Sequence, residues 1–597
     1  MTTRLRSSDD GQTGAATARA PHATIGTIPD TDGRPASERV RDPNAWWRDA
    51  VIYELYIRSF ADGNGDGIGD LAGVRARLPY LASLGIDAIW FTPWYRSPLA
   101  DGGYDIADYR AIDPAFGTLE EAEQLISEAS ALGIRTIVDV VPNHVSDQHP
   151  WFQAALASPP GSAERARFWF HAGRGPGGDE MPTSWPSNFS GPSWTRTVNP
   201  DGSPGEWYLH LFSTAQPDLN WDHPDVRREH EDVLRFWLDR GAAGIRIDSA
   251  ALLVKDPTLP EIPADPGPGG HPNTDRDELH DIYRSWRAIA DSYPGTRILV
   301  GELWLPDVDR FAMYLRPGEL HTAFNFDFMS QPWEAASMRA SIDATLAAHA
   351  PVSAPATWLV SNHDVTRPVT RYGQEDSSFA FVRKRRGTPT DLGLGMRRAR
   401  AAALLCAALP GALYIYQGDE LGLEEVQDLP PHQIEDPMHF RSGGADPGRD
   451  GCRVPLPWSG QTRPFGFSPA GASGEPWLQQ PETWGGKTVE AEQDDPGSML
   501  NLYREALRIR RAAPDLADET MRWLPSVDGV LTFARGDGFV AMTNLSEAAV
   551  ALPPDSEVLL ASADLDHGDL PPDASAWLRI DPETLARSPG WPTREAE

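Results

Sequence analysis

One short segment of the chain carries two charged residues whose spacing could support chemistry. The heptapeptide GIRIDSA (Gly244–Ala250) alternates the β-formers Ile245 and Ile247 with Arg246 and Asp248, which is the period of a strand with two unlike faces. Burying two charges on one face is costly unless they pair with each other or with a ligand. Asp248, kept ionised by Arg246, therefore presents an anionic oxygen to a partner, and a structural ion pair under a loop is the alternative.

Acids or histidines follow three other strand-like segments: Asp139 with Asn143 and His144, then Glu302, then His363 with Asp364. If these strands belong to one barrel, the residues just after each strand converge on one mouth. Carboxylates gathered there repel one another and raise the pKa of at least one of them, as an acid catalyst requires. A carboxylate nucleophile about 5–5.5 Å from a protonated carboxylic acid is the apparatus of a retaining glycosidase. Each acid alone could be a cap or an ion pair, but four acids at four strand ends favour a catalytic site.

From Val51 onwards, short β-branched runs alternate with amphipathic stretches. The predicted strands are Val51–Tyr56, Asp87–Phe91, Arg135–Val140, Gly244–Asp248, Ile298–Leu303, Thr322–Phe326, Thr357–Ser361 and Ala412–Tyr416. Predicted helices include Leu119–Leu132, Val226–Asp239, Asp277–Ser292, Arg397–Ala408 and Leu500–Arg511. Several helices pass to the next strand through a glycine, which suits a C-cap before a buried parallel strand. Eight such units predict an α/β fold, a (β/α)8 TIM barrel.

Two intervals are too long to be simple loops, and both leave the face where barrel enzymes keep their sites. Residues 150–217, rich in Trp, Gly, Pro and Ser, predict a small domain inserted after the third strand. Residues 417–496, rich in Gly and Pro, predict a loop-rich subdomain over the barrel mouth. The barrel would then span residues 45–149 and 218–520. Residues 521–597 predict a C-terminal antiparallel β domain, with strands near Gly529–Phe533, Gly538–Thr543 and Glu557–Leu560.

Composition narrows the class of protein and of partner. Of the 597 residues, 40% are apolar and 21 are tryptophan, which is enough for a large core. The net charge of −33 opposes binding to nucleic acid or to an anionic membrane and favours a neutral or cationic ligand. The two cysteines, Cys406 and Cys452, indicate neither a disulfide framework nor a cysteine metal site.

The N-terminal residues and the longest apolar run bear on localisation. Residues 1–44 are rich in small, polar and Pro residues without apolar periodicity, so they predict a disordered leader rather than a signal peptide. The run Ala401–Tyr416 is interrupted by Pro410-Gly411 and is shorter than the roughly 18 residues of a membrane-spanning helix. We therefore expect a cytoplasmic protein without a membrane anchor, as a monomer or a homodimer.

Regularly spaced oxygen ligands occur in the segment DGNGDGIGD, residues 62–70. Asp62, Asn64, Asp66 and Asp70 alternate with turn glycines and resemble the opening of a calcium-binding EF-hand loop, without its later Glu. A solvated Asp-Gly turn is the alternative. Because the loop is distant from the clustered acids, a Ca²⁺ ion bound there would be structural.

Five ordered motifs carry a family resemblance. Four of them resemble the signatures of glycoside hydrolase family 13, the α-amylase superfamily: DVVPNHVS (Asp139–Ser146), GIRIDSA, GELW (Gly301–Trp304) and SNHD (Ser361–Asp364). The fifth, QPDLN (Gln216–Asn220), is similar to the motif of the oligo-1,6-glucosidase and α-glucosidase branch. The resemblance covers roughly Trp46 to Arg511, and the small β domain also fits that family.

The resemblance implies roles for the residues at the matching positions. Asp248 would be the nucleophile that forms a β-glycosyl ester, and Glu302 would protonate the leaving oxygen and then activate water. Asp364 would bind the 2- and 3-hydroxyls of the sugar more tightly as the ring flattens. Arg246 would keep Asp248 ionised, and His144 and His363 would donate hydrogen bonds to ring hydroxyls.

The segment GGYDIADY after the second strand resembles the glucose-recognition element of the exo-acting members. Tyr104 would stack under the sugar ring, and Asp105 with Arg453 would grip the 4- and 6-hydroxyls of a terminal glucose. That pair would close the far side of the first subsite, so that single glucoses are released. Phe189 would line the aglycone side, and a core position is the equal alternative. In the related α-glucosidases the loop of residues 62–70 holds Ca²⁺, to which Ile68 contributes its carbonyl.

The resemblance implies a retaining, exo-acting α-glucosidase that releases glucose from the non-reducing end of maltose and short α-1,4-linked oligosaccharides. Relatives that favour α-1,6 bonds usually carry valine directly after the nucleophile, whereas Ser249 and Ala250 stand here, as in α-1,4-acting members. The alternatives are an oligo-1,6-glucosidase, and a transglucosylase or isomerase related to trehalose- or sucrose-acting enzymes, which would differ in how well the closed mouth excludes water. A non-catalytic binding homologue would lack at least one of the three acids, and all three are present.

Overall fold

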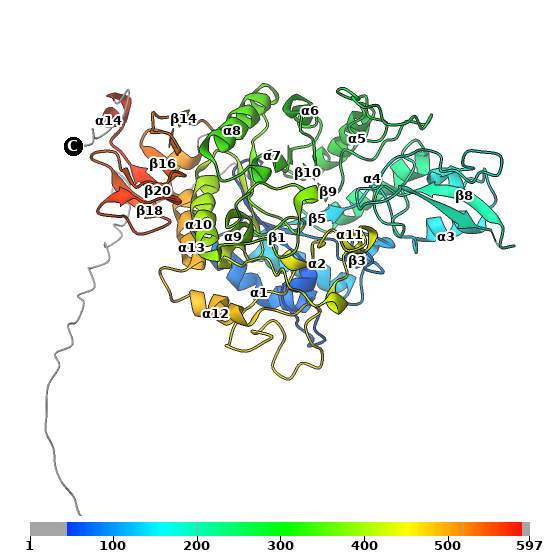
Figure 1. Cartoon of the computed structure of the whole chain (residues 1–597), viewed down its shortest axis with the longest axis horizontal. Coiled ribbons are helices and arrows are strands. Elements are labelled where there is room, and N and C mark those ends of the chain that lie inside the picture. The colour runs from blue at the N-terminus through cyan, green and yellow to red at the C-terminus, as the bar shows by residue number, and fades with distance from the viewer. Residues whose placement is uncertain (1–43, 200, 518, 588–597) are drawn as a thin grey trace, which may run out of the picture. The chain divides into compact units, whose positions relative to one another are not determined.

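Eight parallel strands form the central sheet of the protein (Figure 1). The computed structural model describes residues 44–199, 201–517 and 519–587, so the predicted leader lies outside the described residues apart from its last one. In space the strands follow the order β11-β10-β9-β5-β2-β1-β13-β12. They are β1 (Val51–Leu55), β2 (Ala88–Phe91), β5 (Arg135–Val140), β9 (Gly244–Ile247), β10 (Ile298–Gly301), β11 (Thr322–Ala323), β12 (Thr357–Trp358) and β13 (Ala412–Tyr416). The predicted barrel is confirmed.

A side chain bridges the two outermost strands, β11 and β12, which share no backbone pairing in the described structure. The hydroxyl of Thr357 in β12 donates to the carbonyl of Ala323 in β11 at 2.6 Å and accepts the N–H of Asn325 at 3.1 Å. Both strands are shorter than the sequence predicted. β11 ends early because Asn325 caps the next helix, where its side chain accepts the N–H of Phe328.

Helices alternate with the strands in the predicted order. The longer ones are α1 (Leu71–Leu84), α2 (Leu119–Ala131), α4 (Pro224–Asp239), α5 (Leu279–Asp291), α8 (Ala335–His349), α10 (Leu392–Ala408) and α13 (Met499–Ala512). The shorter ones are α3 (Pro150–Ala157), α6 (Val308–Met313), α7 (Phe326–Ser330), α9 (Pro368–Tyr372), α11 (Pro437–Arg441), α12 (Val489–Glu492) and α14 (Pro582–Arg587). Thr118 and Glu121 form a reciprocal capping box on α2, and the Asp391 cap starts α10 before its predicted first residue, Arg397.

Strand residues alternate between two hydrophobic clusters. Ile52 and Trp90 belong to a cluster inside the barrel, whereas Ile89 belongs to the larger cluster that strands and helices share. Charged residues take inward positions nearer the carboxyl ends of three strands, and all are buried: Glu54, Asp139 and Arg246. The barrel interior is therefore apolar at one end and charged at the other, where barrel enzymes keep their sites.

A separate small sheet lies within residues 150–217, the interval in which the sequence predicted an insertion. It is antiparallel with the order β6-β8-β7, made of β6 (Phe170–His171), β7 (Trp194–Val198) and β8 (Pro204–Leu209). Its own cluster is built on Trp185, Trp194 and Leu209. Figure 1 shows this segment in cyan, around the label β8. A short antiparallel pair, β3 (Tyr95–Arg96) and β4 (Asp108–Ile112), lies earlier in the chain.

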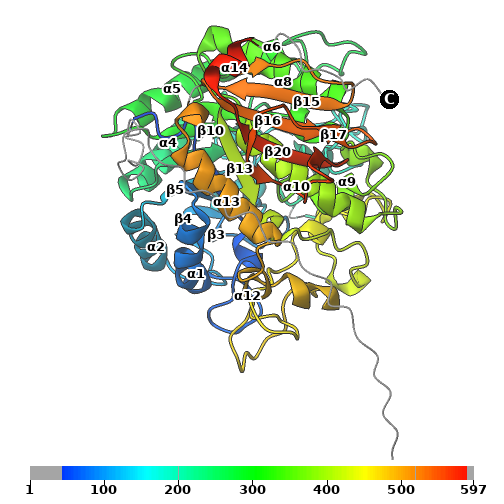
Figure 2. The same cartoon turned by 90° about the vertical axis from the view of Figure 1, so that its left-hand side faces the viewer.

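The C-terminal strands form a five-stranded antiparallel sheet in the order β14-β15-β16-β20-β18 (Figure 2). The strands are β14 (Arg522–Trp523), β15 (Val530–Arg535), β16 (Phe539–Asn544), β18 (Glu557–Ala561) and β20 (Ala574–Arg579), with a separate pair β17 (Val550–Ala551) and β19 (Asp569–Leu570). The indole of Trp577 donates to the carbonyl of Leu404 at 3.1 Å, which fixes the sheet against α10. The contact between α10 and this sheet explains the apolar run near Ala401. Of the helices in the described part of the chain, none has the length and apolar character that a membrane crossing requires.

Candidate active site

The carboxyl ends of the barrel strands meet at a cavity of about 350 Å³. Asp248 directly follows β9 and Glu302 directly follows β10, and these strands are neighbours with Ile247 paired to Gly301. Asp364 reaches the same cavity from the loop after β12. Of the residues predicted to contact substrate, the cavity wall includes Tyr104, His144, Phe189 and His363, while Asp105, Arg246 and Arg453 lie outside it.

Arg246 links three acids of the site. Its guanidinium lies 2.7 Å from Asp248, 2.8 Å from Glu302 and 3.0 Å from Asp139, and the side chain is buried. Burial alone would lower the pKa of Arg246, but the surrounding acids raise that pKa well above its usual value. One cation faces three carboxyl groups, so the cluster favours the retention of a proton on one of them.

Glu302 is the acid placed to retain that proton. Burial raises the pKa of Glu302 to about 7; Arg246 opposes the rise, and the charges of Asp248 and Asp364 add to it. Burial also raises the pKa of Asp248, while Arg246 favours its anion. Near neutral pH a protonated Glu302 beside an ionised Asp248 suits two different roles: Glu302 can act as the acid and Asp248 as the nucleophile.

Two hydrogen bonds orient the Glu302 carboxyl group. Its Oε2 accepts the N–H of Ser249 at 2.8 Å, and its Oε1 accepts the indole N–H of Trp304 at 3.0 Å. Ser249, the residue after Asp248, has a left-handed backbone with φ of 48°, which is uncommon outside glycine and often occurs at functional sites. The turn after β9 thus places the backbone N–H of Ser249, the neighbour of Asp248, against the carboxyl group of Glu302.

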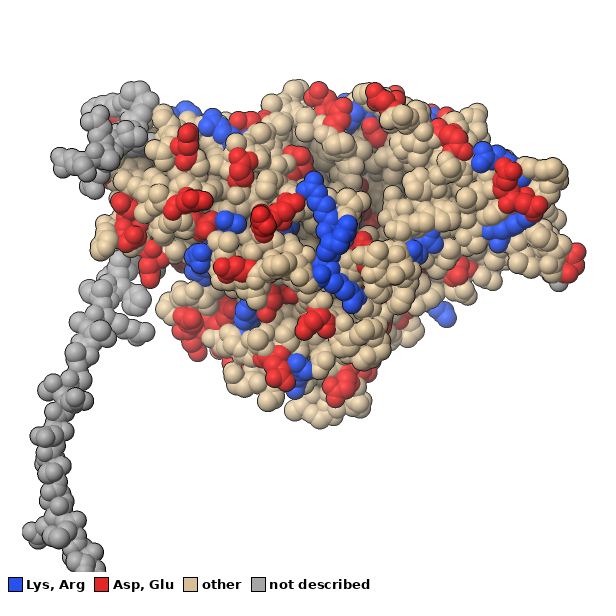
Figure 3. Space-filling model, in the orientation of Figure 1, with Lys and Arg blue, Asp and Glu red and all other residues tan. Residues whose placement is uncertain are grey.

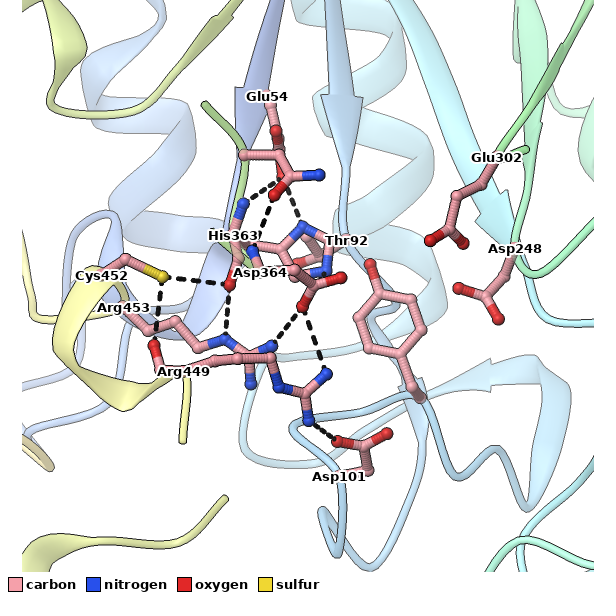
Figure 4. Close-up of polar contacts among 12 residues, drawn as sticks. Glu54, Thr92, Asp101, Asp248, Glu302, His363, Asp364, Arg449, Cys452 and Arg453 are labelled. Carbon is pink, nitrogen blue, oxygen red and sulfur yellow. Dashed lines mark hydrogen bonds and ion pairs between the residues drawn. The ribbon is translucent and has the colours of Figure 1, made fainter. Parts of the chain in front are cut away.

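Asp364 sits in a separate cluster of positive groups (Figure 4). Its Oδ1 accepts hydrogen bonds from Arg453 at 2.7 Å and Arg449 at 3.2 Å. Burial favours the neutral acid, but His363 and the two guanidinium groups outweigh it and hold the pKa of Asp364 well below its usual range. His363 pairs with Glu54 of β1. Burial lowers the pKa of His363 and raises that of Glu54, so the pair acts as a buried hydrogen bond that fixes the ring.

A different acid and a different arginine from the predicted ones pair at the cavity wall. Asp101 lines the cavity and lies 2.6 Å from Arg449. Asp436 holds the same guanidinium from another side, at 2.7 Å. Although burial opposes it, these acids raise the pKa of Arg449 well above its usual value. Burial raises the pKa of Asp101 to about 6, and Arg449 opposes the rise, so near pH 7 an ionised pair stands in the wall beside Asp364.

The predicted contact between Asp105 and Arg453 does not form in the described structure. Asp105 is buried beneath its loop, where its carboxylate accepts the hydroxyl of Ser97 and the N–H groups of Ala100 and Asp101. Arg453 contacts Asp364 from behind the cavity wall. Both acids flank the turn Gly102-Gly103, whose positive φ angles of 60° and 106° decide which acid faces the cavity. Sequence spacing carries no information about that turn.

Tyr104, His144 and Phe189 lie in the cavity wall. The Tyr104 ring is stacked on the ring of His363, with centroids 5.2 Å apart, and its hydroxyl donates to Asp139 at 3.2 Å. The Nε2 of His144 lies 3.1 Å from the carbonyl of Tyr104. Burial lowers the pKa of His144 to about 4, so its ring is neutral near pH 7. Their contacts to a sugar stay predictions.

Part of the cavity wall is aromatic. Trp304 stacks on Phe326 with ring centroids 3.9 Å apart and meets Phe381 edge-on at 5.2 Å. Phe189 and Phe212 form a second edge-on pair, also at 5.2 Å. Such faces suit the apolar face of a sugar ring or another ring-bearing group, while nearby polar groups fix its orientation.

The predicted calcium loop directly precedes α1. Asp70 caps α1 by accepting the N–H of Gly73 and also accepts the N–H groups of Gly63 and Asn64. Asp62 accepts two more backbone N–H groups, from Gly65 and Gly67. Across the described residues, no group of three or more His, Cys, Asp or Glu side chains is arranged to hold a metal ion. Asp70 Oδ1 accepts two of these N–H groups, whereas Asp70 Oδ2 and both carboxylate oxygens of Asp62 accept one each and keep a lone pair, so Ca²⁺ binding stays a prediction.

Carboxyl groups clustered at the strand ends of a (β/α)8 barrel are the arrangement that many glycoside hydrolases use. The family profile described as "Alpha amylase, catalytic domain" matches residues 54–519. The chain therefore belongs to the α-amylase family, glycoside hydrolase family 13.

Individual relatives agree with this assignment. The chain is 34% identical over 526 residues to a probable α-glucosidase of Rhizobium meliloti (strain 1021), covering 84% of this chain and 90% of that protein. It is also 34% identical over 546 residues to a palatinase of Erwinia rhapontici, with 85% and 91% covered. A solved structure, the α-glucosyl transfer enzyme XgtA, is 34% identical with a TM-score of 0.77, covering 89% of this chain and 99% of that one.

Proposed function

We propose that the protein is a retaining, exo-acting α-glucosidase that releases glucose from the non-reducing end of maltose and short α-1,4-linked oligosaccharides. One observation carries the proposal: Asp248 and Glu302, at the ends of adjacent strands, contact the same guanidinium of Arg246. Two carboxyl groups held this close suit attack and protonation at one glycosidic bond. The resemblance to a probable α-glucosidase supports the substrate class.

The reaction uses the two acids in turn. The Asp248 carboxylate attacks the anomeric carbon and forms a glucosyl ester, while Glu302 gives its proton to the leaving oxygen. Glu302, now ionised, takes a proton from the water that cleaves the ester, so the original anomeric configuration returns. A pKa of about 7 lets Glu302 serve in both steps. The low pKa of Asp364 keeps it an acceptor for sugar hydroxyls throughout.

The pair Asp101 and Arg449 supports the exo mode. Both side chains line the cavity and pair with each other at 2.6 Å, and with the pKa of Asp101 at about 6 the pair is ionised near pH 7, so it offers hydrogen bonds to the hydroxyls of a terminal glucose. A longer chain beyond that glucose would displace a buried ion pair, which is costly. The small residue Ser249 after the nucleophile supports the preference for α-1,4 bonds.

Product analysis tests the proposal. Maltose, isomaltose, sucrose and trehalose are supplied separately, and proton NMR follows which sugars and which glucose anomer appear first. We expect rapid release of α-glucose from maltose, and loss of nearly all turnover in Asp248→Asn with maltose still bound. Maltose also releases its reducing-end glucose as a mixture of anomers, so the measured quantity is the initial excess of one anomer over that mixture. An initial excess of β-glucose, or substantial turnover by Asp248→Asn, would refute the retaining mechanism.

The aromatic part of the wall favours a second candidate, transfer of glucose to a sugar acceptor. Trp304, Phe381 and Phe189 give an acceptor ring faces to stack on, and an acceptor held there would compete with water for the glucosyl ester. One similar protein is named an α-glucosyl transfer enzyme and another a palatinase, so these names do not decide between transfer and hydrolysis. Accumulation of new disaccharides from sucrose or maltose, in place of free glucose, would identify the transferase.

We also propose a structural Ca²⁺ in the loop of residues 62–70. The support is the alternation of oxygen-bearing side chains with glycines, a donor set of the kind that Ca²⁺ prefers. When bound, the ion would cross-link the loop that caps α1. It would have no part in the chemical steps.

A further inference from the structure

A second cavity, of about 310 Å³, lies next to the catalytic one. The two cavities share a wall made by residues 379–381 and 447–449. Phe379 and Gly448 face the second cavity, whereas Phe381 and Arg449 face the catalytic one. A volume of this size is within the range of sites that bind small metabolites.

Four consecutive basic residues line the second cavity, and we name them the basic loop: Arg383, Lys384, Arg385 and Arg386. Arg371 lines it as well. The whole chain has 53 basic and 86 acidic residues, so this run opposes the overall charge. Figure 3 shows a band of basic side chains beside the hollow on this face. Like charges held side by side repel one another, and a bound anion would relieve that repulsion.

Much of this positive charge has no acidic partner within the described residues. Arg385 donates to the backbone carbonyls of Val382 and Lys384, and Arg386 forms neither a hydrogen bond nor an ion pair there. The buried Arg371 keeps an Nε without a hydrogen-bond partner in the described structure. A guanidinium N–H that is buried without an acceptor is costly, which points to a ligand that supplies one.

The acids that line the same cavity do not neutralise the run. Asp376 pairs with Arg383 at 3.2 Å, but both side chains are 62% exposed and water weakens such a pair. Glu425 is half-buried; burial raises its pKa, while the nearby Lys384 and Arg367 oppose the rise. The third acid, Glu375, is exposed to solvent. Five basic side chains thus share the cavity with three acids, of which two are exposed to solvent and one is half-buried.

We propose that the second cavity binds an oxyanion, the phosphate or carboxylate group of a small metabolite such as a sugar phosphate. This inference goes beyond the α-glucosidase activity and does not depend on it. The net charge of the chain predicts a neutral or cationic ligand, but local field outweighs net charge where several bases line one concave site. The oxyanion could belong to the aglycone of a bound glucoside or to a separate molecule.

Titration calorimetry on the full chain tests the site, with inorganic phosphate as the first probe and glucose 6-phosphate against glucose as the second. We expect the Arg385→Glu/Arg386→Glu variant to bind phosphate at least tenfold more weakly than wild type. Added NaCl should weaken wild-type binding as well. The control is Arg228→Glu/Arg508→Glu, which makes the same charge change at arginines 66% and 53% exposed on α4 and α13, and it should bind as wild type does.

Absence of phosphate binding by wild type, or equal binding by the two double variants, would overturn the proposal. Kinetic arms distinguish the source of the anion. If the oxyanion is part of the substrate, a disaccharide phosphorylated on its aglycone will show a lower KM than its neutral form, and the basic-loop variant will lose that difference. If it is a separate molecule, free phosphate will change the KM for the neutral disaccharide. Because calorimetry does not need turnover, failure of the hydrolase assignment would leave this test intact.

Discussion

Replacement of Trp304 by phenylalanine removes one hydrogen bond from Glu302 and little else. The indole N–H donates to Glu302 Oε1 at 3.0 Å, and the same ring stacks on Phe326 at 3.9 Å. Phenylalanine keeps a ring for stacking but offers no donor. The variant therefore isolates the effect of that donor on the proposed catalytic acid.

The size of the effect follows from the charge of the acceptor. A hydrogen bond to a carboxylate contributes about 1.5–3 kcal/mol and one to a neutral group about 0.5–1.5 kcal/mol, so the indole favours ionised Glu302 by about 1 kcal/mol. One pKa unit corresponds to about 1.4 kcal/mol. Loss of the donor should raise the pKa of Glu302 from about 7 to roughly 7.7. Trp304 is 37% exposed, so water will replace part of the bond and make the rise smaller.

The pH dependence of kcat/KM on maltose measures this change in the free enzyme. Glu302 must carry a proton to act as the acid, so activity falls as pH rises through its pKa. We expect the alkaline limb near pH 7 in wild type and at higher pH in Trp304→Phe. Phe381→Leu is the matched control, because it removes a neighbouring ring and keeps the hydrogen bond.

An alkaline limb that stays in place in Trp304→Phe would refute the assignment to Glu302. It would point to another group of the cluster, such as Asp139, whose pKa burial also raises to about 7. A limb that moves to lower pH would show that the donor stabilises the protonated acid, which contradicts the reasoning.

Three further changes separate recognition, barrel closure and the metal loop. Asp101→Asn should raise the KM for maltose at least tenfold, because it breaks the pair that lines the cavity. Asp105→Asn should lower Tm with little change in KM, and equal effects of the two changes on KM would contradict the structure. Thr357→Val should lower the free energy of unfolding by about 2–4 kcal/mol, since two buried backbone groups lose their partner. Thr136→Val, where the buried hydroxyl has no partner in the described structure, is the control for denaturant unfolding and should cost much less. Ca²⁺ should raise Tm by several degrees over a chelator without changing kcat/KM, and an identical Tm in both would argue against the metal loop.

The sequence by itself determined the class of fold and the two acids at its centre. Alternation of apolar and charged residues is a local property of one strand, so GIRIDSA already indicated that Arg246 and Asp248 share a face. Repetition of β-then-α units predicted the barrel, and the barrel rule placed Glu302 beside Asp248. The sequence did not determine where each strand ends, because the cap at Asn325 competes with continued pairing in β11.

Only the tertiary structure decided which loop residues face the cavity. Asp101 and Arg449 lie 348 positions apart, and their contact depends on the direction that the turn at Gly102-Gly103 gives to the chain. Nothing in local spacing distinguishes Asp101 from Asp105, since both flank that turn. The second cavity has the same origin: the basic loop is visible as a charge run, but its concave surroundings come from segments far apart in sequence. Periodic patterns report on single elements, whereas contacts between loops depend on the packing of the whole barrel.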